Sequence, residues 1–185
     1  KSETAKKACQ KWFDVRAFGQ VFAFGKGEDA SGVSIPIRGP VSIHTAFSID
    51  PVDVTSNQIT KSVSGEDTKS GKRSADTMGM KHRVDNGVYV FYGSMNPQLA
   101  VRTGFSDEDA ETLKAILPKL FENDASSARP EGSMEVLNVV WWRHACPNGQ
   151  VSSAKVHRSL TVASDGTMTC EPLEGGPQPE IIEGF

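Results

Sequence analysis

The sequence contains few cysteines and no long apolar run, and each scarcity excludes a class of protein. Its 185 residues include only Cys9, Cys146 and Cys170, and no two of them form a CxxC pair. An odd number of isolated thiols excludes a disulfide framework and does not indicate a zinc site. No apolar run approaches the roughly 18 residues that a membrane helix needs. The sequence therefore predicts a globular protein of a reducing cytoplasm, with no membrane partner.

The sequence also lacks the motifs of common catalytic and nucleotide-binding sites. His44, His82, His144 and His157 are scattered, outside any HxxxH or HExxH array, and neither a P-loop nor a GxGxxG fingerprint occurs. A nuclease needs a clustered acid and base, or carboxylates that gather a metal. We therefore expect no enzyme, no catalytic residue, no metal and no cofactor. A ribonuclease that processes RNA is the alternative hypothesis, and a structural oligomer without nucleic-acid affinity is the third.

Acidic residues outnumber basic ones by 23 to 20, which argues against a protein that binds nucleic acid through net charge alone. The distribution is uneven, because Ser159–Phe185 contains five acids and no lysine or arginine. Residues 1–158 therefore carry 20 basic against 18 acidic residues, a net charge of +2. This pattern predicts a mildly basic body at 1–163 and an acidic, Gly/Pro-rich C-terminal tail at 164–185.

A long Gly-, Ser- and Lys/Arg-rich segment at 59–87 separates two regions of β pattern. Loops longer than about 12–15 residues are uncommon in compact domains and are usually functional or disordered. Dispersed cations and unbranched apolar side chains suit wrapping around a polyanion. The side chains of this kind are Lys61, Lys69, Lys72, Arg73, Lys81, His82, Arg83, Met78 and Met80.

The clearest alternation lies in Val33–Ile49, where apolar residues occupy odd positions and polar residues even ones. A period of two predicts a ribbon with one face on the core and one face free. Gly39 and Pro40 are expected to bend this ribbon, because proline cannot donate to a ladder. The free face then presents Arg38, Ser42 and His44 in a row.

Two helices follow from apolar residues at helical spacing. The first covers Ala5–Phe13 and has a basic outer face. The second begins at Ser106 as N-cap, has Asp107, Glu108 and Asp109 in its first turn, and ends near Pro118.

Two further strands, Val88–Tyr92 and Met134–Trp142, are apolar on both faces and are expected to be central in a sheet. Pro147–Gly149 predicts a hairpin turn, with a return strand at Val156–Ala163. If a strand and a helix preceded residue 1, the order would be β-α-β-β-α-β. We therefore expect an α+β fold with an RRM-like, ferredoxin-like antiparallel sheet and a long insertion, whose N-terminal strand and helix are missing from this chain.

Arg16 and Arg38 each lie beside a glycine and a turn. An arginine there either forms a surface salt bridge or acts as a fork for phosphate. The phosphate role is favoured for Arg38, which lies on the free face of a strand, and the two roles are balanced for Arg16. Trp141 and Trp142 lie in an apolar strand, so packing rather than base stacking is expected.

Four strings, in the same order, closely resemble the RNA-backbone subunit of type I CRISPR surveillance (Cascade) complexes, specifically the type I-C branch. They are WFDVRAFGQVFA, RGPVSIHTAFSIDPV, DTMGMKHRVDNGVYVFYGSMNP and FENDASSARPEGSMEV. The resemblance covers roughly residues 12–144 and implies an RRM-like palm with a thumb hairpin at about 59–87. It also implies a non-catalytic subunit whose copies assemble head to tail along the spacer of a CRISPR RNA and leave bases free to pair with target DNA.

The resemblance implies four kinds of partner: CRISPR RNA, target DNA through the guide, other copies of the chain, and other subunits of the surveillance complex. It also assigns candidate RNA contacts by position. Arg16 and Phe18 belong to the FDVRxFG string, and Arg38 and Gly39 to RGPV. The remaining candidates lie in the thumb insertion and at its base, and they are Lys61, Met78, Lys81, His82 and Arg83.

Overall fold

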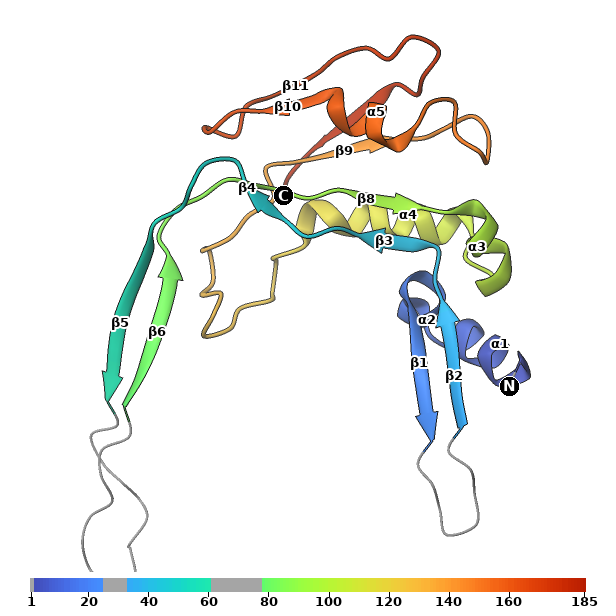
Figure 1. The fold of residues 1–185 in the computed structure, drawn as a ribbon, viewed down its shortest axis with the longest axis horizontal. Helices are drawn as coiled ribbons and strands as arrows, with labels where there is room; N and C mark the ends of the chain where they lie inside the picture. Colours follow the sequence, from blue (N-terminus) through green and yellow to red (C-terminus); the bar gives the residue numbers. More distant parts are fainter. Residues whose placement is uncertain (1, 25–32, 61–77) are drawn as a thin grey trace, which may run out of the picture.

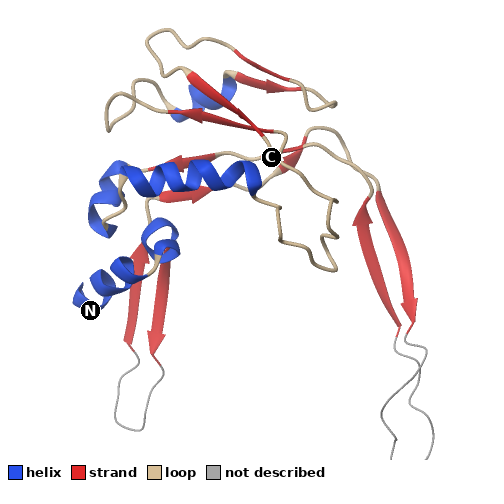
Figure 2. Cartoon of the chain, turned by 180° about the vertical axis from the view of Figure 1, so that it is seen from behind, coloured by secondary structure: helices blue, strands red, loops and turns tan. Residues whose placement is uncertain are grey.

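The computed structural model describes residues 2–24, 33–60 and 78–185. Lys61, one of the predicted RNA contacts, lies outside these residues. In the described part, the chain forms an arch from which two β-hairpin arms project on the same side (Figures 1 and 2). One arm consists of β1 (Gly19–Phe24) and β2 (Val33–Arg38), and the other of β5 (Val54–Thr60) and β6 (Met78–Val84). None of the described helices is long and apolar enough to cross a membrane.

The first arm is attached to two short helices, α1 (Ser2–Lys11) and α2 (Phe13–Phe18). The expected N-terminal helix is therefore present and is broken near Trp12. Ala8, Cys9 and Val15 form a small buried cluster, against which Phe22 and Ile37 pack from the two strands. Along β2, Ile35 is buried while Ser34 and Arg38 are exposed, which confirms for this strand the predicted core face and free face.

The expected ribbon at 33–49 is divided into three strands: β2, β3 (Val41–Ile43) and β4 (Phe47–Ser48). The first break falls at Gly39 and Pro40, as the sequence predicts. β3 pairs with β8 (Gly93–Met95), and β4 pairs with β7 (Tyr89–Val90). The prediction of a central strand at Val88–Tyr92 is therefore wrong, since only two of its residues are in a strand and that strand has one partner.

Two helices, α3 (Pro97–Thr103) and α4 (Asp107–Ile116), follow β8. Ser106 caps α4 with a capping box, in which its Oγ accepts from the Asp109 backbone N–H and the Asp109 carboxylate accepts from the Ser106 N–H. A 3₁₀ turn, η1 (Leu117–Lys119), ends the helix at Pro118. Both ends of the second predicted helix are thus confirmed.

The C-terminal part differs from the sequence-based prediction. Residues 146–149 do form a turn, in which Gly149 N–H donates to Cys146 O and Gly149 has a φ of +77°. The expected return strand at Val156–Ala163 is confirmed only for Leu160–Val162, because Val156–Arg158 belongs to α5 (Ser153–Arg158). Ser152 caps this helix by accepting from the Lys155 N–H, a local signal that overrides the short apolar alternation.

The segment 164–185, interpreted from its composition as a tail, folds back onto the body. β10 (Leu160–Val162) pairs with β11 (Met168–Cys170), and β9 (Asn138–Trp142) pairs with β12 (Pro179–Glu183). Adjacent Ile181 and Ile182 supply apolar side chains to both faces of β12, which suits a strand beside the apolar β9.

All described strand pairs are antiparallel and two-stranded, so the fold is of the α+β class. Figure 1 shows β3 and β8 running beside α4 across the middle of the arch, below β9, β10, β11 and α5. The RRM-like arrangement of these elements stays a prediction. Large apolar side chains are exposed along β3, β4 and the second arm, including Ile43, Phe47 and Met78.

Candidate nucleic-acid interface

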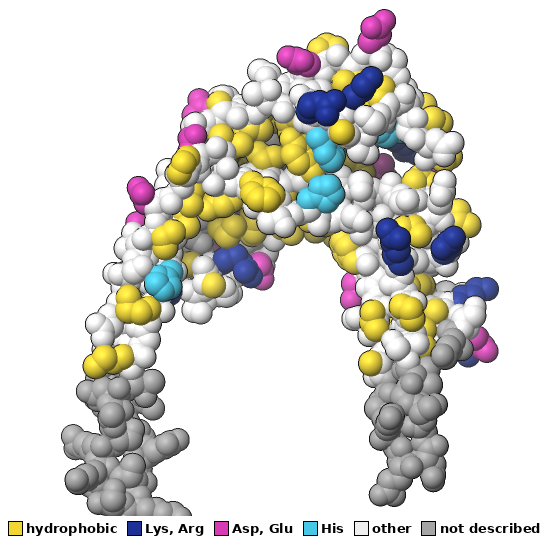
Figure 3. All heavy atoms as spheres, in the orientation of Figure 1, with side chains coloured by type: hydrophobic (Ala, Val, Ile, Leu, Met, Phe, Trp, Pro, Cys, Tyr) yellow, Lys and Arg dark blue, Asp and Glu magenta, His cyan; other side chains and the backbone are white. Residues whose placement is uncertain are grey.

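The predicted site residues fall into two groups, one on each arm. The first group, Arg16, Phe18, Arg38 and Gly39, lies where α2, β1 and β2 meet. The second group, Met78, Lys81, His82 and Arg83, lies along β6 of the other arm. Figure 3 shows both arms reaching downward from the body with open space between them. The fold therefore presents the two groups on the same side of the molecule without bringing them into contact.

Arg38 ends β2 on the face that points away from the buried cluster. It is exposed, and it forms no salt bridge within the described part of the chain. Because β2 holds its backbone in register with Gly19, the position of Arg38 on the arm is fixed while its guanidinium remains available to an anion. This placement agrees with the phosphate role favoured by the sequence, and the RNA contact stays a prediction.

Arg16 lies in a different environment, because its guanidinium is held on two edges. Nε and Nη2 donate to the two carboxylate oxygens of Asp109 at 2.8 and 2.7 Å, and Nη1 donates to Cys9 O at 2.8 Å. The Asp109 hydrogen bonds raise the pKa of Arg16, and the Arg16 hydrogen bonds lower the pKa of Asp109 to about 2. In this conformation Arg16 joins α2 to α4, and an RNA contact for it stays a prediction.

Gly39 is buried against the backbone at the end of α2. A Cβ at this position would lie 2.3 Å from Ala17 O and 2.6 Å from Gly19 N. Gly19, with a φ of +85°, approaches Gly39 in the same way from the other strand. The glycine of the RGPV string therefore has a packing role that does not depend on RNA. Phe18, beside it, is 46% exposed.

The second arm has two different faces. In the β5–β6 register, even-numbered residues pair with even-numbered ones and share a face. We call one side the apolar face; it carries Val54, Met78, Met80, Val84 and a hydrogen-bonded pair, Ser56 Oγ and His82 Nδ1, 2.8 Å apart. The other side, the basic face, carries Lys81 and Arg83.

The two cations of the basic face have different partners. Lys81 Nζ donates to Ser127 O at 3.0 Å, in the loop that follows α4 and η1. Arg83 Nε lies 2.7 Å from the Asp85 carboxylate, which also accepts from Thr55 Oγ1. The Thr55 hydrogen bond, followed by the charge of Arg83, lowers the pKa of Asp85. Arg83 and Asp85 are well exposed, so this ion pair holds Arg83 only weakly.

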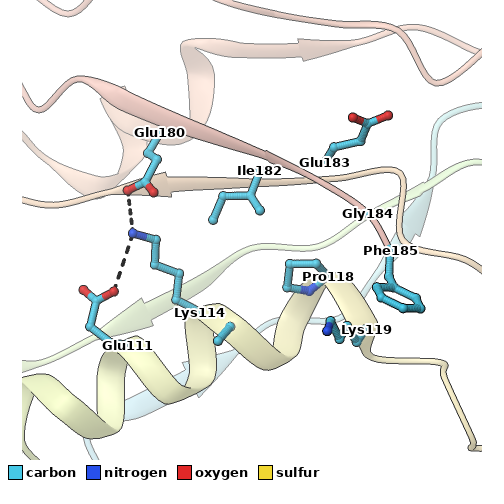
Figure 4. Close-up of a pocket in the computed structure, with 10 residues that line it drawn as sticks. Glu111, Lys114, Pro118, Lys119, Glu180, Ile182, Glu183, Gly184 and Phe185 are labelled. Carbon is cyan, nitrogen blue, oxygen red and sulfur yellow. Dashed lines mark hydrogen bonds and ion pairs between the residues drawn. The ribbon is translucent and has the colours of Figure 1, made fainter.

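A groove lies between α4 and the C-terminal strand, and Figure 4 shows Lys114 there paired with Glu111 and Glu180. Lys114 Nζ lies near Glu180 and 3.6 Å from Glu111, and it sits over the ring of Trp141 at 5.9 Å. The Glu180 hydrogen bond raises the pKa of Lys114. These contacts fasten β12 and β9 to α4, and the groove serves as a structural seam.

Sequence reasoning missed one cluster. His44, on the predicted free face, lies beside His157 and Tyr92, which come from distant parts of the chain. The assignment of Val156–Ala163 to a strand hid this proximity. Ser152, a residue type favoured at the N-cap, was the signal of a helix start that could have revealed this cluster.

Among the described residues, no group of three or more His, Cys, Asp and Glu side chains is arranged to hold a metal ion. The sequence matches the family described as CRISPR-associated protein Cas7 over residues 1–175. No curated protein matches the chain. Proteins of this family are CRISPR RNA-binding backbone subunits that associate with other Cas proteins, and they are generally structural rather than catalytic. Since the match spans nearly the whole chain, this protein belongs to the Cas7 family of CRISPR-associated proteins.

Proposed function

We propose that this chain is the guide-RNA backbone subunit of a type I-C surveillance complex, acting in the cytoplasm. Copies of the chain assemble head to tail along the spacer of a CRISPR RNA and present its bases for pairing with target DNA. The Cas7 match supports the backbone role, and the four strings of the sequence support the type I-C branch. In this proposal, the strands β3 and β8 with α4 belong to an RRM-like palm.

One observation carries the proposal: two hairpin arms project from the same side of the arch, and each has an exposed cation near its base. Arg38 marks the first arm and Arg83 the second. A strand of RNA lying across the arch would meet a guanidinium at each side, and guanidinium–phosphate contacts follow the backbone without reading bases. Binding should therefore be strong, dependent on salt and largely independent of sequence.

The experiment uses the purified chain and single-stranded RNAs of increasing length. We expect gel shifts that weaken steeply between two salt concentrations, and particles that gain copies of the chain as the RNA lengthens, seen by electron microscopy. A single copy per RNA at every length would contradict polymerisation. Binding that follows base composition and ignores salt would contradict the proposed contacts.

The ribonuclease alternative is tested in the same samples, because two adjacent imidazoles can act as acid and base on RNA. The RNA is recovered after incubation and its length is examined on a denaturing gel. Intact RNA supports the binding role. Cleavage that disappears in His44→Ala would establish the ribonuclease in its place.

A further inference from the structure

Three side chains that are far apart in the sequence meet beside α5. The rings of His44, just after β3, and His157, in α5, are 5.9 Å apart and almost perpendicular. Tyr92, between β7 and β8, stacks on His157 at 4.2 Å. Two hydrogen bonds hold the cluster in place. The His44 backbone N–H donates to Tyr92 O at 2.8 Å, and the Tyr92 hydroxyl donates to His157 O at 3.3 Å. We call His44 and His157 the histidine pair.

Neither imidazole of the histidine pair forms a salt bridge with an acidic side chain within the described residues, and α5 carries two further basic residues. Lys155 and Arg158, on the same helix as His157, are exposed and form no salt bridge there. Burial, and then the charge of His44, lower the pKa of His157. Other titratable groups close to α5 are Tyr92, Cys170 of β11, and Glu171, whose backbone N–H donates to Ser159 O. Figure 3 shows histidine side chains near the centre of the molecule, with Lys and Arg side chains above them.

This arrangement suits an anion. In the free protein, burial and the charge of His44 disfavour protonation of His157. An anion beside them would reverse that balance, because it favours the protonated form of both rings. A protonated imidazole donates from both ring nitrogens, and phosphate oxygens accept such charge-assisted hydrogen bonds. Tyr92 stacks on the face of the His157 ring, so it does not cover the ring nitrogens, which lie at the edge.

We propose that the histidine pair is a proton-linked phosphate site, which binds a phosphodiester of the nucleic-acid strand and takes up a proton from solvent as it binds. The site rests on the proposed guide-RNA function and adds a regulation to it, since affinity rises as the pH falls. Only Gly39, Pro40 and β3 separate His44 from Arg38, the last residue of β2, along the chain. A nucleic-acid strand bound at Arg38 can therefore extend to the pair.

The test measures the affinity of the full chain for a mixed-sequence single-stranded RNA at pH 8 and pH 6, at one fixed salt concentration. We expect RNA to raise the pKa of the pair by about one unit, which corresponds to a factor of about ten in affinity. Wild type should therefore bind about tenfold more tightly at pH 6 than at pH 8. His44→Gln should lose most of the gain in affinity between pH 8 and pH 6. His144→Gln is the matched control, because His144 lies elsewhere and its Nδ1 accepts from Gln150 N–H.

His44→Gln decides the outcome, because His44 is exposed and its loss should leave the melting temperature unchanged, whereas His157→Gln also removes a packed ring. Equal pH dependence in wild type and His44→Gln overturns the phosphate site and leaves RNA binding standing. Failure to bind RNA at either pH overturns both. A second readout, the NMR titration of the His157 imidazole, should show its lowered pKa rising when RNA is added.

A single-stranded DNA of the same sequence identifies the strand that the pair contacts. An equal pH effect with DNA shows a general phosphodiester site, and an effect confined to RNA assigns the pair to the guide. An unchanged NMR pKa for His157 with both strands would overturn the proposal.

Discussion

Arg16 and Asp109 are 93 residues apart in the sequence and are joined by two hydrogen bonds, Nε to Oδ2 and Nη2 to Oδ1. Their side chains are only 20% and 13% exposed. Asp109 also accepts from the Ser106 N–H, so one carboxylate caps α4 and anchors α2. This carboxylate thereby links the first arm to the body.

Asp109→Asn should destabilise the fold by about 2 kcal/mol at neutral pH, because the carboxylate pKa is about 2 in the fold and 3.8 when unperturbed. A lowered carboxylate pKa stabilises the fold above the unfolded value, and this stabilisation is lost as the pH falls toward 2. Urea unfolding at pH 7, 4 and 3 measures the difference from wild type, which should shrink between pH 4 and 3. The control is Asp107→Asn, whose side chain is 90% exposed.

Gly39→Ala should destabilise the protein by about 2 kcal/mol, because the added Cβ would meet backbone atoms that cannot rotate away. Thermal unfolding measures this effect. Gly79→Ala, on β6, is the matched control, since a Cβ there meets nothing within 4 Å. An unchanged melting temperature for Gly39→Ala would contradict the packing role and leave RNA contact as the reason for a glycine at this position.

Arg38→Ala should weaken RNA binding without unfolding the domain. The loss of a charge-assisted phosphate contact costs roughly 1.5–3 kcal/mol of binding free energy, and a surface arginine changes stability by no more than about 0.5 kcal/mol. Gel shifts and melting curves are compared with those of Arg102→Ala, an exposed arginine of α3. A large fall in melting temperature with unchanged affinity would show that Arg38 is structural.

Removing charge from the basic face of the second arm should reduce the salt dependence of RNA binding. Each lost phosphate contact reduces the slope of log affinity against log salt by about 0.7 for a single strand. Lys81→Gln and Arg83→Gln are compared with Lys6→Gln on the exposed side of α1. If all three variants keep the wild-type slope, the basic face does not contact RNA.

Local signals predicted the elements that local interactions determine. The capping box at Ser106 and the alternation along β2 lie within a few residues, so the sequence alone indicated them. The partner of Asp109 could not be found in this way, because it depends on α2 meeting α4 across 93 residues. Asp109 was interpreted as an acid that favours the helix start, which is only half of its role.

The error at Val156–Ala163 has a similar cause. A six-residue helix offers too few turns for a clear apolar period, and the apolar alternation of the same residues fits a strand equally well. Once α5 was missed, His157 could not be placed beside His44. The exposed position of Arg38 on β2 could therefore be predicted from one strand alone, whereas the meeting of His44 and His157 depends on two distant segments and could not.

Exposed apolar side chains along β3, β4 and the second arm, such as Phe47 at 72%, give this protein a further property. So much apolar surface in contact with solvent favours local unfolding and aggregation of a copy that is not bound to other subunits. Any partner that binds only the folded chain shifts it toward the folded state. Unassembled copies would then be the first that cellular proteases remove, and the amount of protein retained would follow the supply of guide.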